Sequence, residues 1–327
     1  MAYNGLISTG NVDLHPEFLA EIFTSAAEQS AVLKMGRQLR NMTTRELKLK
    51  VSTALPEVYF VGEKGLSQTF PADALKQTTT SEWNDVSMYA GELAAIIVIP
   101  NSVFNDADFD IFGEIRNQIP EAIAKKVDSA VLFGTHAVNV PDDWSDGVLT
   151  GMPAENQITV GDLGDIYDDI LGEGGVFAQV ELDGYDVNGI VADVSLKGKL
   201  RGLREKDAGG TYTGQPIFTQ SMQAANQYTL DGVPMAFPRN GGFDASSALM
   251  IAGDWSKLVY SIRQDVAFDV FTTGVVQDGS GAIQHNLMQE DLTALRVTFR
   301  MGWAMPLAAN RVTASGTAYP FSAYLPE

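Results

Sequence analysis

MYAGELAAIIVIP, residues 88–100, predicts a long strand. Its second half, Leu93 to Ile99, is almost continuously apolar, which is typical of a strand that is covered on both faces. Pro100 ends the strand, because a proline cannot donate the backbone hydrogen bond that a strand interior needs. We therefore expect one long strand in this part of the chain, buried on both sides.

A long helix is predicted directly after this strand. Asp106 or Asp108 can cap its start, since a carboxylate accepts hydrogen bonds from the free N–H groups of a first turn. Pro120 is expected to kink or divide the helix, and Gly134 can end it. The apolar residues recur at spacings of three and four, as on one helix face: Phe112, Ile115, Ile119, Ile123, Val127 and Ala130 or Val131.

The second half of the chain alternates between helical and strand patterns. Aspartates and glycines mark a boundary near residue 142. Helices are then predicted at 163–171 and 195–204, and strands at 186–192, 234–237 and 248–251. This alternation indicates an α/β domain. A second long strand, Thr293 to Ala304, follows that domain and can return to the first domain.

Two segments before residue 88 do not fit a compact domain. Pro16 is a good first helical residue, and the apolar stripe after it predicts a helix that ends near Gln29. Residues 47–51 alternate as in a strand. Residues 56–81 are rich in turn-forming and polar residues, and so long a polar insertion is uncommon in a compact domain. We interpret it as an extended hairpin that projects from the body. The stripe consists of Phe18, Leu19, Ile22 and Phe23.

A run of positive charge lies between these two segments and is opposed only by Glu46. Such a run usually marks a solvated helix face. The alternative is an arm that pairs with acidic residues of a neighbouring subunit. The cations are Lys34, Arg37, Arg40, Arg45, Lys48 and Lys50, and the acidic residues suited to pair with them are Asp106, Asp108, Asp110 and Glu114.

Composition restricts the classes of function. The 327 residues include no cysteine and carry a formal net charge of -19. Disulfide and thiolate chemistry are therefore excluded, and direct binding to nucleic-acid phosphates is disfavoured. An acidic chain also suits a container wall that does not adhere to DNA, or simply a need for solubility. The sequence shows neither a signal peptide nor an apolar run long enough to span a bilayer, so we expect a protein made in the cytoplasm with no membrane partner.

The sequence predicts no catalytic site, metal site or cofactor. His15, His136 and His285 each lack the neighbouring ligands of a zinc site. The acidic run 106–110 begins like a calcium loop but lacks its glycine and its closing glutamate. An enzyme that uses scattered carboxylates remains an alternative, although these more simply form a solvated helix face: Asp165, Asp168 and Asp169. We therefore predict a protein that is not an enzyme.

The order of these segments resembles the major capsid protein family of tailed bacteriophages. Each motif is weak alone, but their shared order spans residues 15–312. The earlier motifs are the arm, the polar hairpin, the long strand, Asn101-Ser102, Asp106, the long helix and Phe133-Gly134. The later ones are 200–209, 215–218, 230–234, Ile251-Ala252-Gly253-Asp254-Trp255 with Tyr260 and Ile262, and 292–300 followed by Pro306-Leu307-Ala308.

The resemblance implies an α+β fold, the phage major capsid protein fold of the HK-ninety-seven type, which encapsulins and herpesvirus capsid floors share. In that fold the arm and the extended loop reach across neighbouring subunits. The implied parts are an N-terminal arm (1–45), an extended β-hairpin loop (52–87), a peripheral domain with a long spine helix (88–141 and 287–316), an axial α/β domain (142–286) and a C-terminal tail (317–327).

The implied function is a shell subunit that forms hexamers and pentamers around the double-stranded DNA of a tailed phage. The expected partners are other copies of the chain, a portal protein, a separate scaffolding protein, a decoration protein, and packaged DNA without sequence-specific binding. The expected location is the virion, after assembly in the host cytoplasm. An encapsulin-like compartment for cargo enzymes, or a non-shell binding protein, would be the alternative.

Contacts between subunits are expected at the basic run, the extended loop and the acidic residues before the long helix. Lys64 and Lys76 lie in the loop, but no matching Asn and Glu identify the cross-linking chemistry of some family members. The expected contact residues are Arg37, Arg40, Arg45, Lys48, Lys50, Glu63, Lys64, Phe70, Trp83, Asp106 and Asp108.

Overall fold

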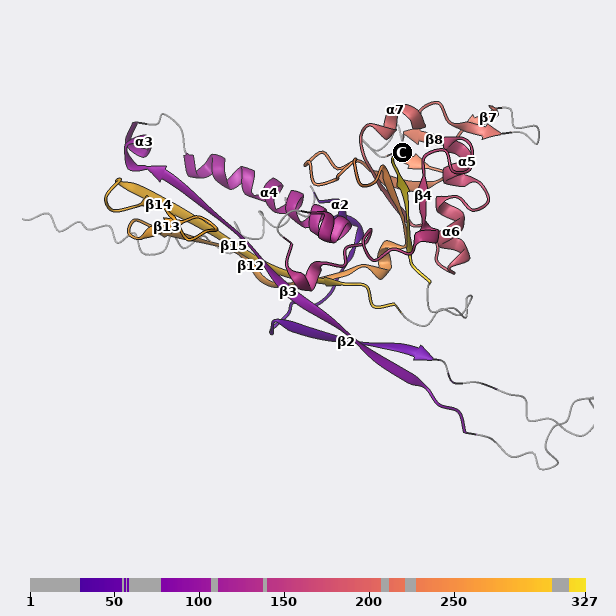
Figure 1. Ribbon diagram of the computed structural model, residues 1–327, viewed down its shortest axis with the longest axis horizontal. Coiled ribbons are helices and arrows are strands. Elements are labelled where there is room, and N and C mark those ends of the chain that lie inside the picture. Colours follow the sequence, from indigo (N-terminus) through magenta and orange to yellow (C-terminus); the bar gives the residue numbers. More distant parts are fainter. Residues whose placement is uncertain are drawn as a thin grey trace, which may run out of the picture.

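The structure is a computed structural model that describes residues 30–54, 56, 58, 78–106, 111–137, 140–206, 212–220, 228–307 and 318–327. It has two lobes and two long extensions (Figure 1). The helix predicted from Pro16 to Gln29 and most of the polar insertion at 56–81 lie outside the described residues.

One lobe is built on a five-stranded sheet with the order β1-β12-β15-β3-β2. Strand β15 pairs antiparallel with the second part of β3, from Leu292 opposite Pro100 to Gly302 opposite Ala90. The second long strand therefore returns to the first domain, as predicted, and lies beside the first long strand. The strands are β1 (Arg37–Gln38), β2 (Glu46–Ala54), β3 (Glu82–Pro100), β12 (Val259–Phe271) and β15 (Leu292–Ala304).

The long helix α4 (Ile111–Phe133) packs on this sheet. Its apolar stripe shares one core cluster with alternate residues of β15. The helix continues through Pro120, so this residue does not divide it, and the expected kink stays a prediction. A short helix α3 (Asn101–Asp106) precedes it, and Asp106 therefore ends α3 instead of capping α4. Gly134 ends α4 as predicted, with a φ of 52° that favours glycine.

The second lobe is built on a seven-stranded sheet with the order β4-β16-β11-β5-β10-β9-β8. A separate apolar cluster fills it. The strands are β4 (Gln157–Thr159), β5 (Gly189–Ala192), β8 (Phe218–Gln220), β9 (Tyr228–Leu230), β10 (Val233–Ala236), β11 (Met250–Gly253) and β16 (Phe321–Leu325), and the helices are α5 (Ile166–Leu171), α6 (Val176–Leu182) and α7 (Leu196–Leu200).

Strand pairing divides the chain differently from the boundaries drawn on the sequence. Strand β12 lies within the range 142–286, yet it pairs with β15 of the first sheet. Strand β16 lies within the expected tail, yet it occupies an interior position between β4 and β11 of the second sheet. Both lobes are therefore assembled from segments that are distant in sequence.

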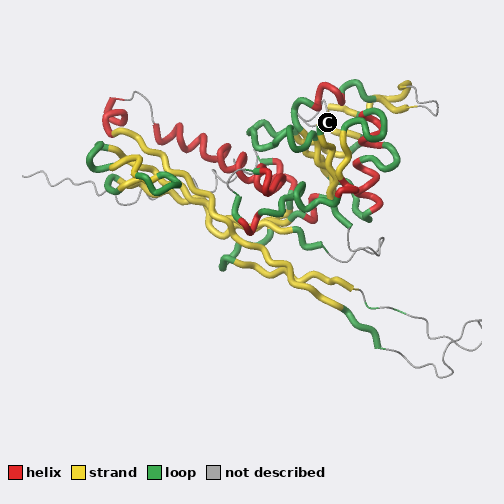
Figure 2. Tube along the Cα trace, viewed as in Figure 1, coloured by secondary structure: helices red, strands yellow, loops and turns green. Residues whose placement is uncertain are grey.

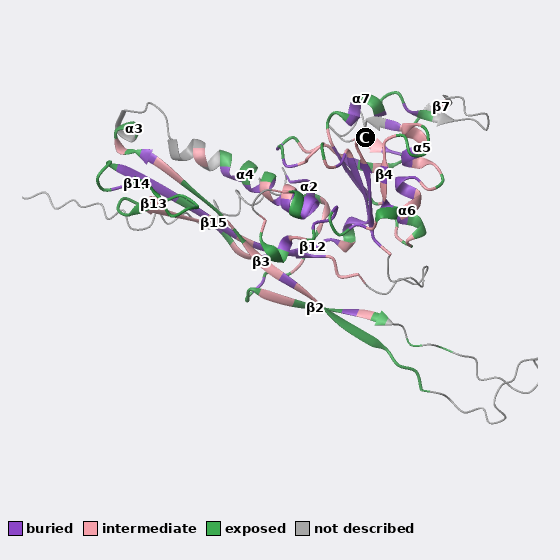
Figure 3. Ribbon diagram, viewed as in Figure 1, coloured by how far each residue is buried: buried purple, intermediate pink, exposed green. Residues whose placement is uncertain are grey.

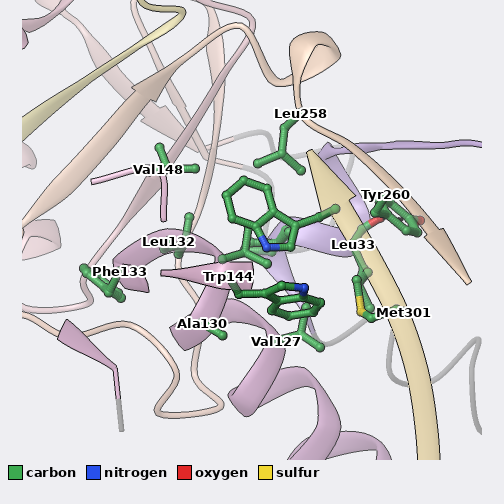
Figure 4. Close-up of a cluster of buried hydrophobic side chains, with 14 of the residues drawn as sticks. Leu33, Val127, Ala130, Leu132, Phe133, Trp144, Val148, Leu258, Tyr260 and Met301 are labelled. Carbon is green, nitrogen blue, oxygen red and sulfur yellow. Dashed lines mark hydrogen bonds between the residues drawn. The ribbon is translucent and has the colours of Figure 1, made fainter. Parts of the chain in front are cut away.

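The described part of the expected arm packs on its own chain. Helix α2 (Ala31–Met35) lies against α4, and β1 continues from it into the first sheet. Ala31, Val32 and Leu33 are buried, as is Met42 after them. Figure 4 shows this core, in which Leu33 of α2, Val127 of α4 and Met301 of β15 meet near Trp144. Residues 30–42 are therefore part of the body, and the expectation that the whole range 1–45 is an arm needs this correction.

Two hairpins extend from the first lobe in opposite directions. Strands β2 and β3 form the longer one, which leaves the body at the lower right of Figure 2. The other contains β13 (Val275–Gln277) and β14 (Ile283–Asn286) at the far end. A third, smaller ladder pairs β6 (Arg204–Lys206) with β7 (Tyr212–Pro216) on the second lobe.

Candidate assembly surfaces

The β2–β3 hairpin confirms the predicted strand at 47–51 and carries it away from the body. Its ladder runs from Glu46 opposite Tyr89 to Ala54 opposite Glu82. Beyond the body the first part of β3, residues 82–85, is exposed, whereas Val51 of β2 is buried (Figure 3). The indole of Trp83 is 64% exposed there, which is unusual for so large an apolar side chain. No described element of the same chain covers it.

Trp144 fixes the direction in which this hairpin leaves the body. Its indole Nε1 donates a hydrogen bond to the backbone oxygen of Tyr89 over 3.1 Å. The ring lies against Gly91, where an added Cβ would approach Trp144 Cε2 to 3.1 Å. Nearby, the Arg45 guanidinium lies 3.0 Å from an Asp143 carboxylate oxygen. Glycine at residue 91 thus allows the tryptophan to lie close to the strand.

One face of β3 is open, contrary to the prediction that both faces are buried. The register places Ile96 opposite Arg296, on the face away from α4. Ile96 is 53% exposed. On the same face Arg296 binds Asp269 over 2.6 Å and lies over the ring of Phe271, and Arg300 binds Glu92. The apolar run that suggested double burial therefore presents a surface that the described chain leaves uncovered.

The far end of the first lobe exposes a second apolar surface. Val275 and Ile283, on the paired strands β13 and β14, are both exposed, and so is Met288 after them. The sequence analysis missed this hairpin. Its signal was the turn sequence Asp278-Gly279-Ser280-Gly281, which follows the β-branched pair Val275-Val276.

The basic run does not form a helix face, so that interpretation was wrong. Arg37 lies in β1, and Lys48 and Lys50 lie in β2, where they alternate with the half-buried Leu47 and Leu49. Strand alternation, with a period of two, separates the charges from the apolar residues there. All the cations from Lys34 to Lys50 are exposed.

Three of these cations have acidic partners within their own chain. Arg45 pairs with Asp143, Lys50 lies 2.8 Å from Asp85, and Lys48 lies 3.8 Å from Glu46. The hydrogen bond from Lys50, followed by the charges of Lys50 and Lys48, lowers the pKa of Asp85. Exposed pairs of this kind contribute little to stability, so they remain available to exchange partners.

The other expected contact residues are not brought together. Trp83 lies on the hairpin and Asp106 ends α3, near the opposite end of the first lobe (Figure 1). Arg40 is exposed between β1 and β2, and its backbone oxygen accepts a hydrogen bond from Ser261 Oγ. Glu63, Lys64, Phe70 and Asp108 lie outside the described residues, as does the side chain of Asp106.

Two of the three carboxylates considered for an enzyme, Asp165 and Asp169, have structural roles. Asp165 caps α5 by accepting hydrogen bonds from the N–H groups of Tyr167 and Asp168. Asp169 is buried and accepts three hydrogen bonds, including one from the hydroxyl of Tyr324 on β16. Within the described ranges, no group of three or more His, Cys, Asp or Glu side chains could hold a metal ion. None of the described helices is long and apolar enough to cross a membrane.

Comparison with known proteins identifies the family. The model of the phage capsid family matches residues 10–308, which is most of the chain. The chain belongs to the phage capsid family. A chain of Microbacterium phage Oxtober96 has a similar structure, with 29% identity, a TM-score of 0.73 and 91% coverage of both chains. A chain of Mycobacterium phage Cain has 27% identity and a TM-score of 0.71, and the match covers 91% of this chain and 90% of that one.

A curated relative supports the same family. The major capsid protein of Staphylococcus phage 80alpha is 24% identical over 290 residues, which cover 87% of this chain and 79% of the relative. The predicted resemblance to phage major capsid proteins is therefore confirmed, together with the α+β capsid fold. The family and its relatives favour a viral capsid protein over an encapsulin-like compartment protein.

Proposed function

We propose that copies of this capsid protein assemble through their β2–β3 hairpins into the hexamers and pentamers of an icosahedral shell around double-stranded DNA. A portal protein and a separate scaffolding protein are the other proposed partners, with a decoration protein on some shells. Assembly takes place in the host cytoplasm. The chain acts as a structural protein with no catalytic role.

The observation that carries this proposal is a hairpin that leaves the body with a large apolar side chain exposed. No described element covers Trp83, which is 64% exposed, and we assign its burial to another molecule. A ring of identical subunits provides one, because in a heterologous contact one patch meets a different patch of the next copy. The open face of β3 around Ile96 is the proposed acceptor.

The charge of the chain supports an enclosing role for the shell. A net charge of -19 repels DNA phosphates, so the shell encloses the genome without sequence-specific binding. Permanent interfaces of large assemblies bury about 2,000 Å² or more. A long hairpin increases that buried area without enlarging the hydrophobic core of the subunit.

Deleting residues 56–80 tests the role of the hairpin. The strands β2 and β3 are rejoined through an Asn-Gly turn, which suits a two-residue hairpin. The deletion variant should keep the far-ultraviolet circular dichroism and the cooperative unfolding of the unaltered subunit. Under conditions in which the unaltered protein forms shells, it should remain a small species in negative-stain micrographs and in analytical ultracentrifugation.

The matched control deletes 279–281 from the turn between β13 and β14 and replaces them with Asn-Gly. It shortens an exposed turn at the other end of the same lobe and should leave closed shells. Closed shells of normal diameter from the 56–80 deletion would remove residues 56–80 from the mechanism.

A further inference from the structure

A groove between the two lobes gathers positive charge in a strongly acidic protein. Its volume is about 1330 Å³. Helix α2 and β1 form one wall, and the other follows β9, β10 and the residues after β10. Four lining residues are cations and one is a carboxylate: Lys34, Arg37, Lys197, Arg239 and Glu121.

The cations of this groove have no acidic partner among the described residues. Lys34, Arg37 and Arg239 are exposed and form no ion pair there, in contrast to Arg45 and Lys50 nearby. Positive charges held close together without counter-charges repel one another. The groove is therefore complementary to a negatively charged occupant.

The buried cation Lys197 is held by aromatic rings on the second wall. Its Nζ lies 3.5 Å from the ring centroid of Tyr228 and 5.3 Å from that of Phe237. The hydrogen bond from Lys197, and then the charges of Lys197, Arg201 and Arg239, lower the pKa of Tyr228. The positive potential thus extends over this wall. Apolar surface from Met35, Met235 and Trp255 lines the remainder of the groove.

The residues that precede this groove in the sequence match its chemistry. Residues 1–29 contain no lysine or arginine. Their helix-forming part also has an apolar stripe that can cover the apolar lining of the groove. The carboxylates are Asp13, Glu17, Glu21 and Glu28, and the stripe is Phe18, Leu19, Ile22 and Phe23.

The point of attachment places this segment at the groove. Ser30 is itself a lining residue. It is fixed by a hydrogen bond from its Oγ to Asp128 over 2.5 Å and by capping α2. A segment tethered at the edge of a groove has an effective concentration there in the millimolar range or above. From residue 31 the chain already packs on its own body.

We propose that the groove binds the acidic residues 13–29 of its own chain. The N-terminal segment then completes the junction between the two lobes before any neighbour is met. This differs from the family expectation that the arm crosses to another subunit, and it does not depend on the proposed shell assembly.

Zero-length cross-linking with a carbodiimide tests the proposal on the full chain. The reagent joins a carboxylate to a lysine amine in contact with it. Protein labelled with ¹⁵N and unlabelled protein are mixed, brought to assembly conditions and cross-linked, and the peptides are identified by mass spectrometry. We expect Glu17, Glu21 or Glu28 to be joined to Lys34 or Lys197. Both peptides of each product should carry the same isotope.

Two controls make the result specific. Lys199 lies exposed on α7 but does not line the groove, so it should yield no such product. Reversing two cations, Arg37→Glu with Arg239→Glu, should lower the yield at least about fivefold, because the carboxylates are then repelled. The Lys199→Glu variant should leave the yield unchanged.

Three outcomes would overturn the proposal. One is the absence of cross-links between the N-terminal segment and Lys34 or Lys197 in the unaltered protein. Another is a set of mixed-isotope products, which would assign the segment to a neighbouring copy. The third is a yield that does not change on charge reversal. The first two measurements need no variant, so they stand even if the double variant fails to fold.

Discussion

The hydroxyl of Ser30 donates a hydrogen bond to the Asp128 carboxylate over 2.5 Å, although the two residues are 98 positions apart. The same carboxylate accepts hydrogen bonds from the N–H groups of Ala31 and Val32 and from the Asn240 side chain. Asp128 is fully buried. It therefore joins α2, the long helix and the loop after β10 at one point. Burial raises its pKa, and these hydrogen bonds act in the opposite direction.

Replacing Asp128 with alanine should destabilise the subunit strongly. The change leaves buried donors from two segments unsatisfied, and breaking such a site costs about 3–5 kcal/mol. Urea denaturation of the unassembled subunit, followed by tryptophan fluorescence, gives the change in the free energy of unfolding. Asp186→Ala removes an exposed carboxylate and should stay within about 0.5 kcal/mol. A loss below about 1 kcal/mol at Asp128 would contradict the structural role given to it.

The two tryptophans at the base of the hairpin should respond differently to the same substitution. Their rings meet edge to face with centroids 6.4 Å apart. Trp144 Nε1 donates to the Tyr89 oxygen, whereas Trp303 Nε1 is buried with no hydrogen-bond partner in the described structure. Trp144→Phe should therefore cost about 1–2 kcal/mol more than Trp303→Phe. Equal midpoints in parallel urea titrations would show that the Trp144 hydrogen bond contributes nothing net.

Replacing glycine with alanine should change the stability of the subunit in opposite directions at two positions. At Gly134, φ is 52° and a Cβ would lie 2.3 Å from the Gly147 nitrogen, so Gly134→Ala should cost about 3 kcal/mol or more. At Gly198, inside α7, a Cβ meets nothing within 4 Å, so Gly198→Ala should stabilise by about 0.5–1 kcal/mol. Thermal unfolding of both variants checks the pair. Stabilisation at Gly134 would refute the close approach of the two backbones.

The turn between β13 and β14 should lose stability only in strong acid. Hydrogen bonds from Ser280 first, then from Ala282 and Gln284, lower the pKa of Asp278 to about 2. Because the folded pKa lies below the unfolded value of 3.8, the contribution is present above that value and is lost as the pH falls through about 2. Ser280→Ala should raise this pKa, as seen in the carboxyl ¹³C shift of Asp278. Ser256→Ala, which removes a similar bond to Asp254, should leave it unchanged.

Trp83 should matter for assembly but not for folding. Its indole is exposed in the single subunit, so Trp83→Ala should change the free energy of unfolding by no more than about 0.5 kcal/mol. A buried tryptophan at an interface is worth about 2 kcal/mol or more, so the critical concentration for shell formation should rise at least about tenfold. Leu182 is 62% exposed on α6 and provides the matched control. Light scattering over a concentration series gives the critical concentration of each variant. An unchanged critical concentration for Trp83→Ala would place this side chain outside the interface.

The long elements could be predicted because their patterns are local. Strand β15 and the end of α4 at Phe133 lie close to where the apolar periodicity and Gly134 placed them. Strand β12 was missed, since register shifts between Ile262 and Ala267 interrupt its alternation. The basic run was assigned to a helix face because a run of charge usually marks one, whereas the alternation at 47–51 correctly predicted a strand.

The sequence by itself determined the two long strands, the spine helix, the projecting hairpin and the resemblance to phage capsid proteins. Each of these depends on residues within a few positions of one another, or on the order of such segments along the chain. Only the tertiary structure decided that Asp128 meets Ser30 and Asn240, that β16 enters the second sheet, and that the apolar strand at Ile96 keeps one face open. Those facts depend on which distant segments come together. A pattern of apolar residues indicates that a side chain will be buried, but it does not indicate which element, or which molecule, will cover it.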